Sequence, residues 1–228
     1  MSKKAVILLS GGLDSATTLF LAKKQGFECF CLVFDYGQRH IREIESARRI
    51  AKKAQCRCLV LKISFPWRGS ALLDKKATLP YSKNIERQQQ IPSTYVPARN
   101  TIFLSFALSY AEVIGAEAIF IGANAIDFSG YPDCRPQYYL RFNSLIRLAT
   151  KTTFSGKEIK IITPLIKKSK AEIIRLANKL GVPLELTWSC YRGLKVPCGK
   201  CDSCLLRSRG FAQAKLIDPL LEKRYGAC

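Results

Sequence analysis

The stretch Ser10-Gly11-Gly12-Leu13-Asp14-Ser15 decides the fold of this chain. It follows the apolar run 5–9, which is short and continuously hydrophobic, as a buried parallel strand is. Residues 16–25 after it have the apolar spacing of a helix, and Gly26 ends that helix. A glycine-rich turn therefore joins the carboxyl end of a strand to the amino end of a helix. Unpaired backbone N–H groups and the helix dipole favour a phosphate at such a turn.

The turn lacks the Gly-Lys-Ser/Thr of a Walker A loop and the Gly-x-Gly-x-x-Gly of a dinucleotide-binding turn. It resembles the PP-loop, S-G-G-x-D-S, of the ATP pyrophosphatase superfamily. Those enzymes hold the pyrophosphate end of ATP and transfer AMP to an oxygen of the substrate, so the resemblance implies the same chemistry here. The alternative is an ordinary glycine-rich turn capped by Ser15.

Hydrophobic patterning predicts a βαβαβ order at the start of the chain, which is typical of a doubly wound parallel sheet in an α/β, Rossmann-like fold. The PP-loop resemblance implies the adenine nucleotide alpha hydrolase-like form of that fold. The expected strands are 5–9, 28–34, 57–63, 118–121 and 159–162, and the expected helices are 16–25, 40–54, 101–114, 137–151, 171–180 and 202–214.

Two parts of the chain depart from this pattern. The segment 64–92 is rich in proline and polar residues and is interpreted as an insertion, with a short helix near 70–75. It is either a lid over the nucleotide or an irregular excursion. We expect a nucleotide-binding domain at 1–185 and a small four-cysteine region at 186–228. His40, the only histidine, is interpreted as a surface residue.

Composition bounds the class of protein. The 228 residues fit one domain with a small appendage, and no apolar run approaches the ~18 residues of a spanning helix. With no recognisable signal peptide, we expect a cytoplasmic protein whose scattered cysteines are thiols. The net charge of +20, from 37 basic and 17 acidic residues, favours polyanions such as RNA. A solvated basic surface is the alternative.

Ligands of doubly wound sheets bind beyond the carboxyl ends of the strands, which places the PP-loop and residues 35–38 at one edge. Adenine is expected near Val33, Phe34 and Asp35. Arg99 lies at the amino end of a predicted helix, with Asn100 as its N-cap, where a guanidinium binds phosphate oxygens. A surface salt bridge is the alternative for this arginine.

A third group of polar residues follows the strand 118–121. It comprises Gly122-Ala123-Asn124 and the segment 127–136, which contains Tyr131 and Asp133. Aromatic faces stack a flat heterocycle, and amide or carboxylate groups read its hydrogen-bonding edge. A Pro/Gly turn with aspartate capping is the alternative.

Four cysteines near the end have the spacing C-x7-C-x2-C-x2-C: Cys190, Cys198, Cys201 and Cys204. The two short spacings and a fourth thiol within reach favour a closed, tetrahedral zinc site with a structural role. An iron–sulfur cluster is the rival interpretation, because four thiolates also hold clusters.

Together these motifs resemble the 7-cyano-7-deazaguanine synthase family of queuosine biosynthesis over nearly the full chain. The matching segments are Ser10 to Thr18, Val96-Pro97-Ala98-Arg99-Asn100, Gly122-Ala123-Asn124, Asp127 to Arg135 and the four cysteines. The first marks only the superfamily, whereas the substrate segment together with the cysteine spacing is far more specific. The resemblance implies that 7-carboxy-7-deazaguanine, ammonia and two ATP give the 7-cyano base, two AMP and two pyrophosphates.

The resemblance also implies site residues. Asp14 and Arg99 are expected to be catalytic, with Asp14 positioning Mg²⁺, and Asn124, Tyr131 and Asp133 are expected to face the deazaguanine. The nucleotide is expected to contact Leu8, Leu9, Ser10, Gly11, Gly12, Leu13, Asp14, Ser15, Ala16, Thr17, Thr18 and Asp35. We expect one Zn²⁺ per chain, small-molecule substrates, no membrane and a homodimer. The alternatives are a PP-loop enzyme that modifies tRNA directly and a zinc-dependent nucleic-acid-binding module without catalysis.

Overall fold

A computed structural model of the chain describes residues 2–39, 42–67, 69–74, 76–77, 91–126, 130–152 and 156–220. Its strands form one parallel sheet in the order β3-β2-β1-β4-β5, with every adjacent pair parallel. The strands are β1 Lys4–Leu8, β2 Glu28–Asp35, β3 Arg57–Lys62, β4 Ala118–Ile121 and β5 Lys160–Ile162. The predicted doubly wound parallel sheet is confirmed.

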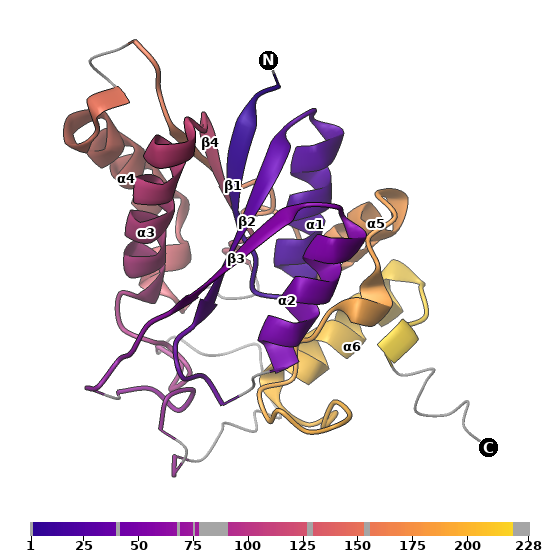
Figure 1. Cartoon of the computed structure of the whole chain (residues 1–228). Coiled ribbons are helices and arrows are strands. Elements are labelled where there is room, and N and C mark those ends of the chain that lie inside the picture. The colour runs from indigo at the N-terminus through magenta and orange to yellow at the C-terminus, as the bar shows by residue number, and fades with distance from the viewer. Residues whose placement is uncertain are drawn as a thin grey trace.

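Helices cover both faces of this sheet (Figure 1). One layer holds α1 Leu13–Lys24, α2 Arg42–Lys53, α5 Lys170–Lys179 and α6 Asp202–Ala214, and the other holds α3 Arg99–Ile114 and α4 Pro136–Ala149. The 3₁₀ turns η2 Pro132–Cys134 and η4 Leu184–Leu186 lie in connections. Helix α6 packs into the same core as α1 and α5. The domain boundary at 185/186 stays a prediction.

The central strand β1 explains the two layers. Its side chains alternate, so Ala5 and Ile7 enter the core with α1, α2 and α5, whereas Val6 and Leu8 enter the core with α3 and α4. The chain leaves β1 toward β2 and later crosses back to β4 on its other side. The crevice between the carboxyl ends of β1 and β4 is therefore the switch point, where such sheets bind ligands.

The starts of α1 and α3 differ from the sequence-based expectation by two or more residues. Helix α1 begins at Leu13 rather than at residue 16, which places Asp14 and Ser15 in its first turn. Helix α3 begins at Arg99, so the prediction that Asn100 is its N-cap is wrong. The backbone N–H of Asn100 is instead capped across the fold by the Asp133 carboxylate, at 3.3 Å.

The described part of the insertion forms turns. The carbonyl of Ser70 accepts hydrogen bonds from the N–H groups of Leu73 and Asp74, so the helix expected near 70–75 is a single turn. Residues 78–90 lie outside the described residues, as do His40 and 127–129. In the part of the chain that the structure describes, no helix combines the length and apolarity needed to cross a bilayer.

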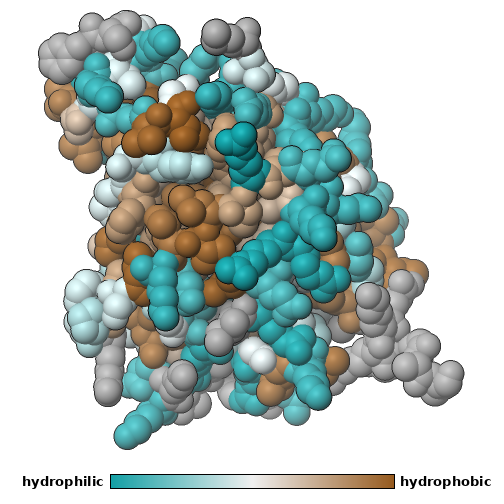
Figure 2. All heavy atoms as spheres, viewed as in Figure 1, coloured by the Kyte–Doolittle hydropathy of each residue, from teal (hydrophilic) through white to brown (hydrophobic). Residues whose placement is uncertain are grey.

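One face of the molecule carries exposed apolar side chains. Figure 2 shows them gathered over α3, in the orientation of Figure 1. Val113 on α3 is 80% exposed, and Leu148 on α4 is 84% exposed. Contiguous apolar surface of this kind is a feature of interaction sites.

Candidate active site

The PP-loop is held in shape by its own serines. The hydroxyls of Ser10 and Ser15 lie 3.0 Å apart, and that of Ser15 also donates to the Gly12 carbonyl at 3.1 Å. The backbone N–H of Ser10 donates to the Ser15 hydroxyl at 3.2 Å. Ser10 itself is exposed just after β1, so this turn presents polar groups to the crevice.

Gly11 lets α2 approach this loop. Its φ is +83°, and a Cβ there would lie 2.2 Å from the Glu43 carbonyl oxygen and 2.8 Å from the Ala47 nitrogen. In place of a side chain, the Gly11 carbonyl accepts hydrogen bonds from the Ser46 hydroxyl and the Trp188 N–H, each at 2.9 Å. The glycine is therefore required for both its left-handed conformation and the close contact.

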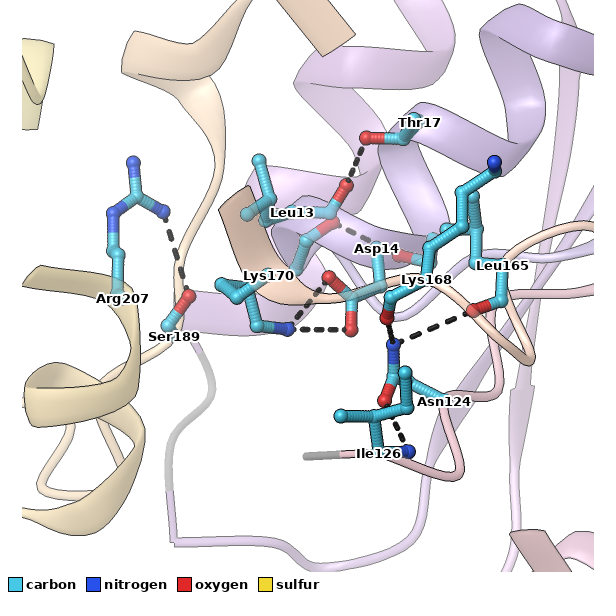
Figure 3. A network of polar contacts seen from close by, with 12 residues as sticks. Leu13, Asp14, Thr17, Asn124, Ile126, Leu165, Lys168, Lys170, Ser189 and Arg207 are labelled. Atoms are coloured by element: carbon cyan, nitrogen blue, oxygen red, sulfur yellow. Dashed lines mark hydrogen bonds and ion pairs between the residues drawn. The ribbon is translucent and has the colours of Figure 1, made fainter. Parts of the chain in front are cut away.

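Asp14 and Lys170 form the main ion pair beside the loop. Figure 3 shows the Lys170 ammonium group against both carboxylate oxygens of Asp14, at 2.9 and 2.8 Å. Lys170 is the first residue of α5, directly after the N-cap Ser169 and inside the capping box that Ser169 forms with Glu172. The sequence analysis missed Lys170 as a site residue. The available signal was that capping box, because it begins a helix after the last strand, at the same sheet edge.

A cavity of about 260 Å³ opens at this edge. Among the described residues, Asp14, Arg99, Asn124 and Tyr131 of the predicted set line it, together with Leu8, Leu9, Ser10, Gly12, Leu13 and Ser15. Of the residues predicted to bind the nucleotide or the substrate, those that do not line it are Gly11, Ala16, Thr17, Thr18, Asp35 and Asp133. Thr17 and Thr18 are buried and bond back to carbonyls within α1, which gives them a structural place under the loop.

Arg99 lies at the amino end of α3, as expected, and projects into the cavity lining. Its Nη1 donates to the Tyr36 hydroxyl at 3.2 Å, and the guanidinium lies 5.8 and 5.9 Å from the ring centres of Tyr36 and Phe103. Aromatic faces hold an arginine in place without neutralising it. This arginine therefore keeps its positive charge for an anion in the cavity.

The three residues expected to face the substrate differ in their surroundings. The Tyr131 hydroxyl lies 2.6 Å from the Thr94 hydroxyl, and burial raises the pKa of Tyr131. The Asn124 amide donates to the carbonyls of Leu165 and Lys168, and its oxygen accepts from Ile126 N–H at 2.8 Å (Figure 3). Asn124 therefore shapes the turn after β4 while lining the cavity.

Asp133 is 6% exposed, and burial raises the pKa of its carboxyl. Its Oδ2 accepts the Asn100 N–H at 3.3 Å, which ties the substrate segment to the amino end of α3. Asp35 accepts the Gly37 N–H at 3.4 Å. The ligand roles predicted for Asp133 and Asp35 stay predictions.

The four cysteines converge, and their sulfur atoms all lie within 4.8 Å of one another. Tetrahedral bonds of about 2.3 Å to one zinc ion separate thiolates by about 3.8 Å, so the cluster is of the right size for one metal ion. The backbone N–H of Cys198 donates to the Cys190 sulfur at 3.3 Å, and the N–H groups of Lys200 and Cys201 donate to the Cys198 sulfur at 3.4 Å. Such donors favour thiolate ligands.

The segments next to the four cysteines also line the cavity. It is lined by Trp188 and Ser189 before the first cysteine, by Tyr191 directly after that cysteine, and by Arg207 after the last one. Arg207 is 5% exposed and forms a bidentate ion pair with Asp218, at 2.6 and 2.9 Å. Residues next to the cysteine cluster and residues of the PP-loop thus line the same cavity.

A doubly wound parallel sheet with a PP-loop at its switch point, facing a cavity lined by the cationic side chains of Arg99, Lys170 and Arg207, defines a nucleotide-binding protein of the PP-loop class. The family model for the queuosine biosynthesis protein QueC matches residues 4–215. The chain belongs to this family.

Curated relatives agree over nearly the whole chain. A 7-cyano-7-deazaguanine synthase from Nostoc punctiforme is 56% identical over 96% of this chain and 99% of its own. The enzyme of that name from Thermoplasma volcanium is 48% identical over 99% of this chain and 93% of its own. Among solved structures, the NMN synthetase from Francisella tularensis has the same fold, with a TM-score of 0.50 at 16% identity, covering 95% of this chain and 88% of its own.

Proposed function

We propose that the chain is a 7-cyano-7-deazaguanine synthase, which converts 7-carboxy-7-deazaguanine, ammonia and two ATP to the 7-cyano base, preQ0, with release of two AMP and two pyrophosphates. The observation that carries the proposal is the shared cavity. The PP-loop, Lys170 and Arg99 line one space with Tyr131 and Asn124, so a nucleotide and a heterocycle can meet there. The names of relatives at 48–56% identity support the same reaction.

The reaction needs activation because a carboxylate is a poor electrophile at neutral pH. Adenylation makes one carboxylate oxygen a good leaving group, and ammonia then displaces AMP to give the amide. A second adenylation, on the amide oxygen, lets AMP and a proton depart and leaves the nitrile. The site's task is to orient ATP for in-line attack at the α-phosphate and to offset the developing charge.

The chain's residues divide this work. Ser10, Gly12 and Ser15 hold the pyrophosphate with hydroxyls and backbone N–H groups, and Lys170 and Arg99 offset phosphate charge. Asp14 is the residue that would hold Mg²⁺, an ion that neutralises phosphate oxygens when bound. Tyr131, Asn124 and Asp133 orient the deazaguanine. Asp35, at the carboxyl end of β2, lies near the adenine.

Cys190, Cys198, Cys201 and Cys204 hold one Zn²⁺ with a structural role, since four thiolates leave no open position for substrate. The size of the cluster and its N–H···S bonds support this assignment. An iron–sulfur absorbance in the purified protein would overturn it.

The decisive experiment is mass spectrometry of the products formed from the carboxylated base, ATP and ammonium. We expect the 7-cyano base and AMP. Formation of ADP instead of AMP would refute the PP-loop assignment. Modification of tRNA without turnover of the free base would favour the alternative enzyme, which the +20 charge motivates.

We further expect a cytoplasmic homodimer. The apolar surface over α3 (Figure 2) and the exposed side chains of Val113 on α3 and Leu148 on α4 support a second copy as the partner. Light scattering on the wild type and on Val113→Glu tests the expectation. A monomeric wild type would contradict it.

A further inference from the structure

The proposed function requires the site to select a guanine-type base, which differs from other flat heterocycles in its 2-amino group, a hydrogen-bond donor. We propose that the side-chain oxygen of Asn100 accepts a hydrogen bond from this 2-amino group and so determines which base the enzyme takes. This inference rests on the proposed function and adds a specificity-determining residue to the same cavity.

The orientation of the Asn100 amide is fixed by its neighbours. Asn100 is the second residue of α3, is largely buried, and lines the cavity. Its Nδ2 donates to the Asp133 carbonyl at 3.3 Å and lies 3.6 Å from the Cys134 sulfur. Only the NH₂ end of an amide can donate to a carbonyl, so this bond identifies the other end as the oxygen.

That oxygen, Oδ1, is the acceptor that the cavity offers. No group of the residues that the structure describes donates a hydrogen bond to it. It is not sealed inside the protein either, because the Nε of Arg39 is the one buried side-chain nitrogen or oxygen without a partner in the described part of the chain. A ligand that fills the cavity without supplying a donor would leave this oxygen unpaired, which costs free energy.

Asp133 holds Asn100 through two bonds. Its carboxylate accepts the backbone N–H of Asn100 at 3.3 Å, and its carbonyl accepts the side-chain amide at the same distance. The Tyr139 hydroxyl donates to that carbonyl as well, at 3.0 Å. Asp133 is outside the cavity lining. It is therefore a positioning residue, which acts on the substrate by holding Asn100 in place before the base binds.

The place of Asn100 suits the 2-amino group. Helix α3 covers one face of the sheet, whereas α1 and α5, which carry Asp14 and Lys170, cover the other (Figure 1). The cavity joins the two layers. The 7-carboxylate and the 2-amino group lie at opposite ends of the deazaguanine. With the carboxylate at the PP-loop for adenylation, the amino group points toward α3, and Phe103 and Tyr131 line the space for the ring between.

A comparison of two substrates tests the bond. The probe is 7-carboxy-7-deazahypoxanthine, the same base without its 2-amino group. We expect the wild type to prefer the amino-bearing base at least about 10-fold in kcat/KM, because the probe leaves Oδ1 without a donor. Asn100→Ala should lower this preference about 10-fold, and the loss should fall on the amino-bearing base. Enzyme and substrate changes together form a double-mutant cycle, which isolates the one contact.

Tyr139→Phe is the matched control, because it removes a bond to the same Asp133 carbonyl and leaves Oδ1 unchanged. It should keep the wild-type preference even where thermal unfolding shows a lower Tm. Asn100→Ser keeps a hydroxyl for the Asp133 carbonyl and is too short to present an acceptor to the base. It should lose the preference too, and it replaces the alanine variant if that variant does not fold.

Equal losses of kcat/KM for the two bases in the Asn100 variants would overturn the proposal, because a purely structural role slows both alike. A wild type that converts both bases equally well would also overturn it, and the proposed function would stand. A wild type that converts neither base would refute the proposed function itself, and the inference with it.

Discussion

The side-chain nitrogen of Lys170 bonds both carboxylate oxygens of Asp14, at 2.9 and 2.8 Å, and so joins the first turns of α5 and α1. Both side chains are mostly buried, 11% and 16% exposed. An incoming Mg–ATP brings phosphate oxygens for Lys170 and a metal ion for Asp14. We therefore expect the two residues to exchange partners when nucleotide binds, with the pair keeping both in place beforehand.

Lys170→Met should lower AMP release about 10²-fold, because one preorganised positive charge on the phosphates is lost. Initial rates of AMP formation at saturating substrates measure this. Lys167→Met, an exposed lysine outside the cavity lining, is the matched control and should leave the rate unchanged. Normal turnover by the Lys170 variant would limit its pairing with Asp14 to a structural role.

Asp14→Ala should abolish AMP formation while the protein stays folded. The substitution removes the group that would hold Mg²⁺, so activity is lost. Lys170 is left beside a cavity that admits water, so the loss of stability is small. Thermal unfolding checks the fold, and AMP formation checks the chemistry. Turnover at the wild-type rate would show that the nucleotide assignment is wrong.

The sequence alone predicted the sheet, the PP-loop and the cysteine cluster because each depends on local pattern. Apolar runs specify buried strands, and glycine and cysteine spacing specifies a turn or a metal cluster. Lys170 was missed because it reaches the cavity from a helix whose packing is set by contacts far along the chain, such as its ion pair with Asp14. The wrong cap at Asn100 has the same origin, since its N–H is satisfied by Asp133, 33 residues away.

Gly11→Ala should destabilise the protein. An alanine here would have to keep the left-handed backbone conformation, and its Cβ would lie 2.2 Å from the Glu43 carbonyl oxygen. Helix α2 would therefore have to move. We expect a loss of about 3 kcal/mol or more, which lowers Tm by about 6–12 °C for a chain of this size. Gly12→Ala is the control, because its nearest neighbours would lie at 3.5 Å, and it should keep the wild-type Tm. Similar Tm values for the two variants would contradict the proposed packing role of Gly11.

Asp218→Asn should also be destabilising. Asp218 forms the bidentate pair with Arg207, whose side chain also bonds Thr187 at 2.8 Å, and both partners of the pair are under 7% exposed. Removing one charge leaves the other buried and uncompensated, which costs about 3–5 kcal/mol. Chemical denaturation measures this. The control is Glu158→Gln, which breaks an exposed pair with Arg147 and should change stability little.

Removal of the metal should weaken nucleotide binding as well as stability. The backbone N–H of Trp188, two residues before Cys190, donates to the Gly11 carbonyl at 2.9 Å. The segment that leads into the cysteine cluster therefore bonds directly to the PP-loop. We expect chelation, or Cys201→Ser, to lower Tm by on the order of 10 °C and to raise the Kd for a non-hydrolysable ATP analogue. Cys58→Ser, at an exposed thiol outside the cluster, should change neither value. A metal-free protein that stays folded and binds the analogue with unchanged affinity would show that the Trp188–Gly11 bond persists without the metal, and the cluster would then serve stability alone.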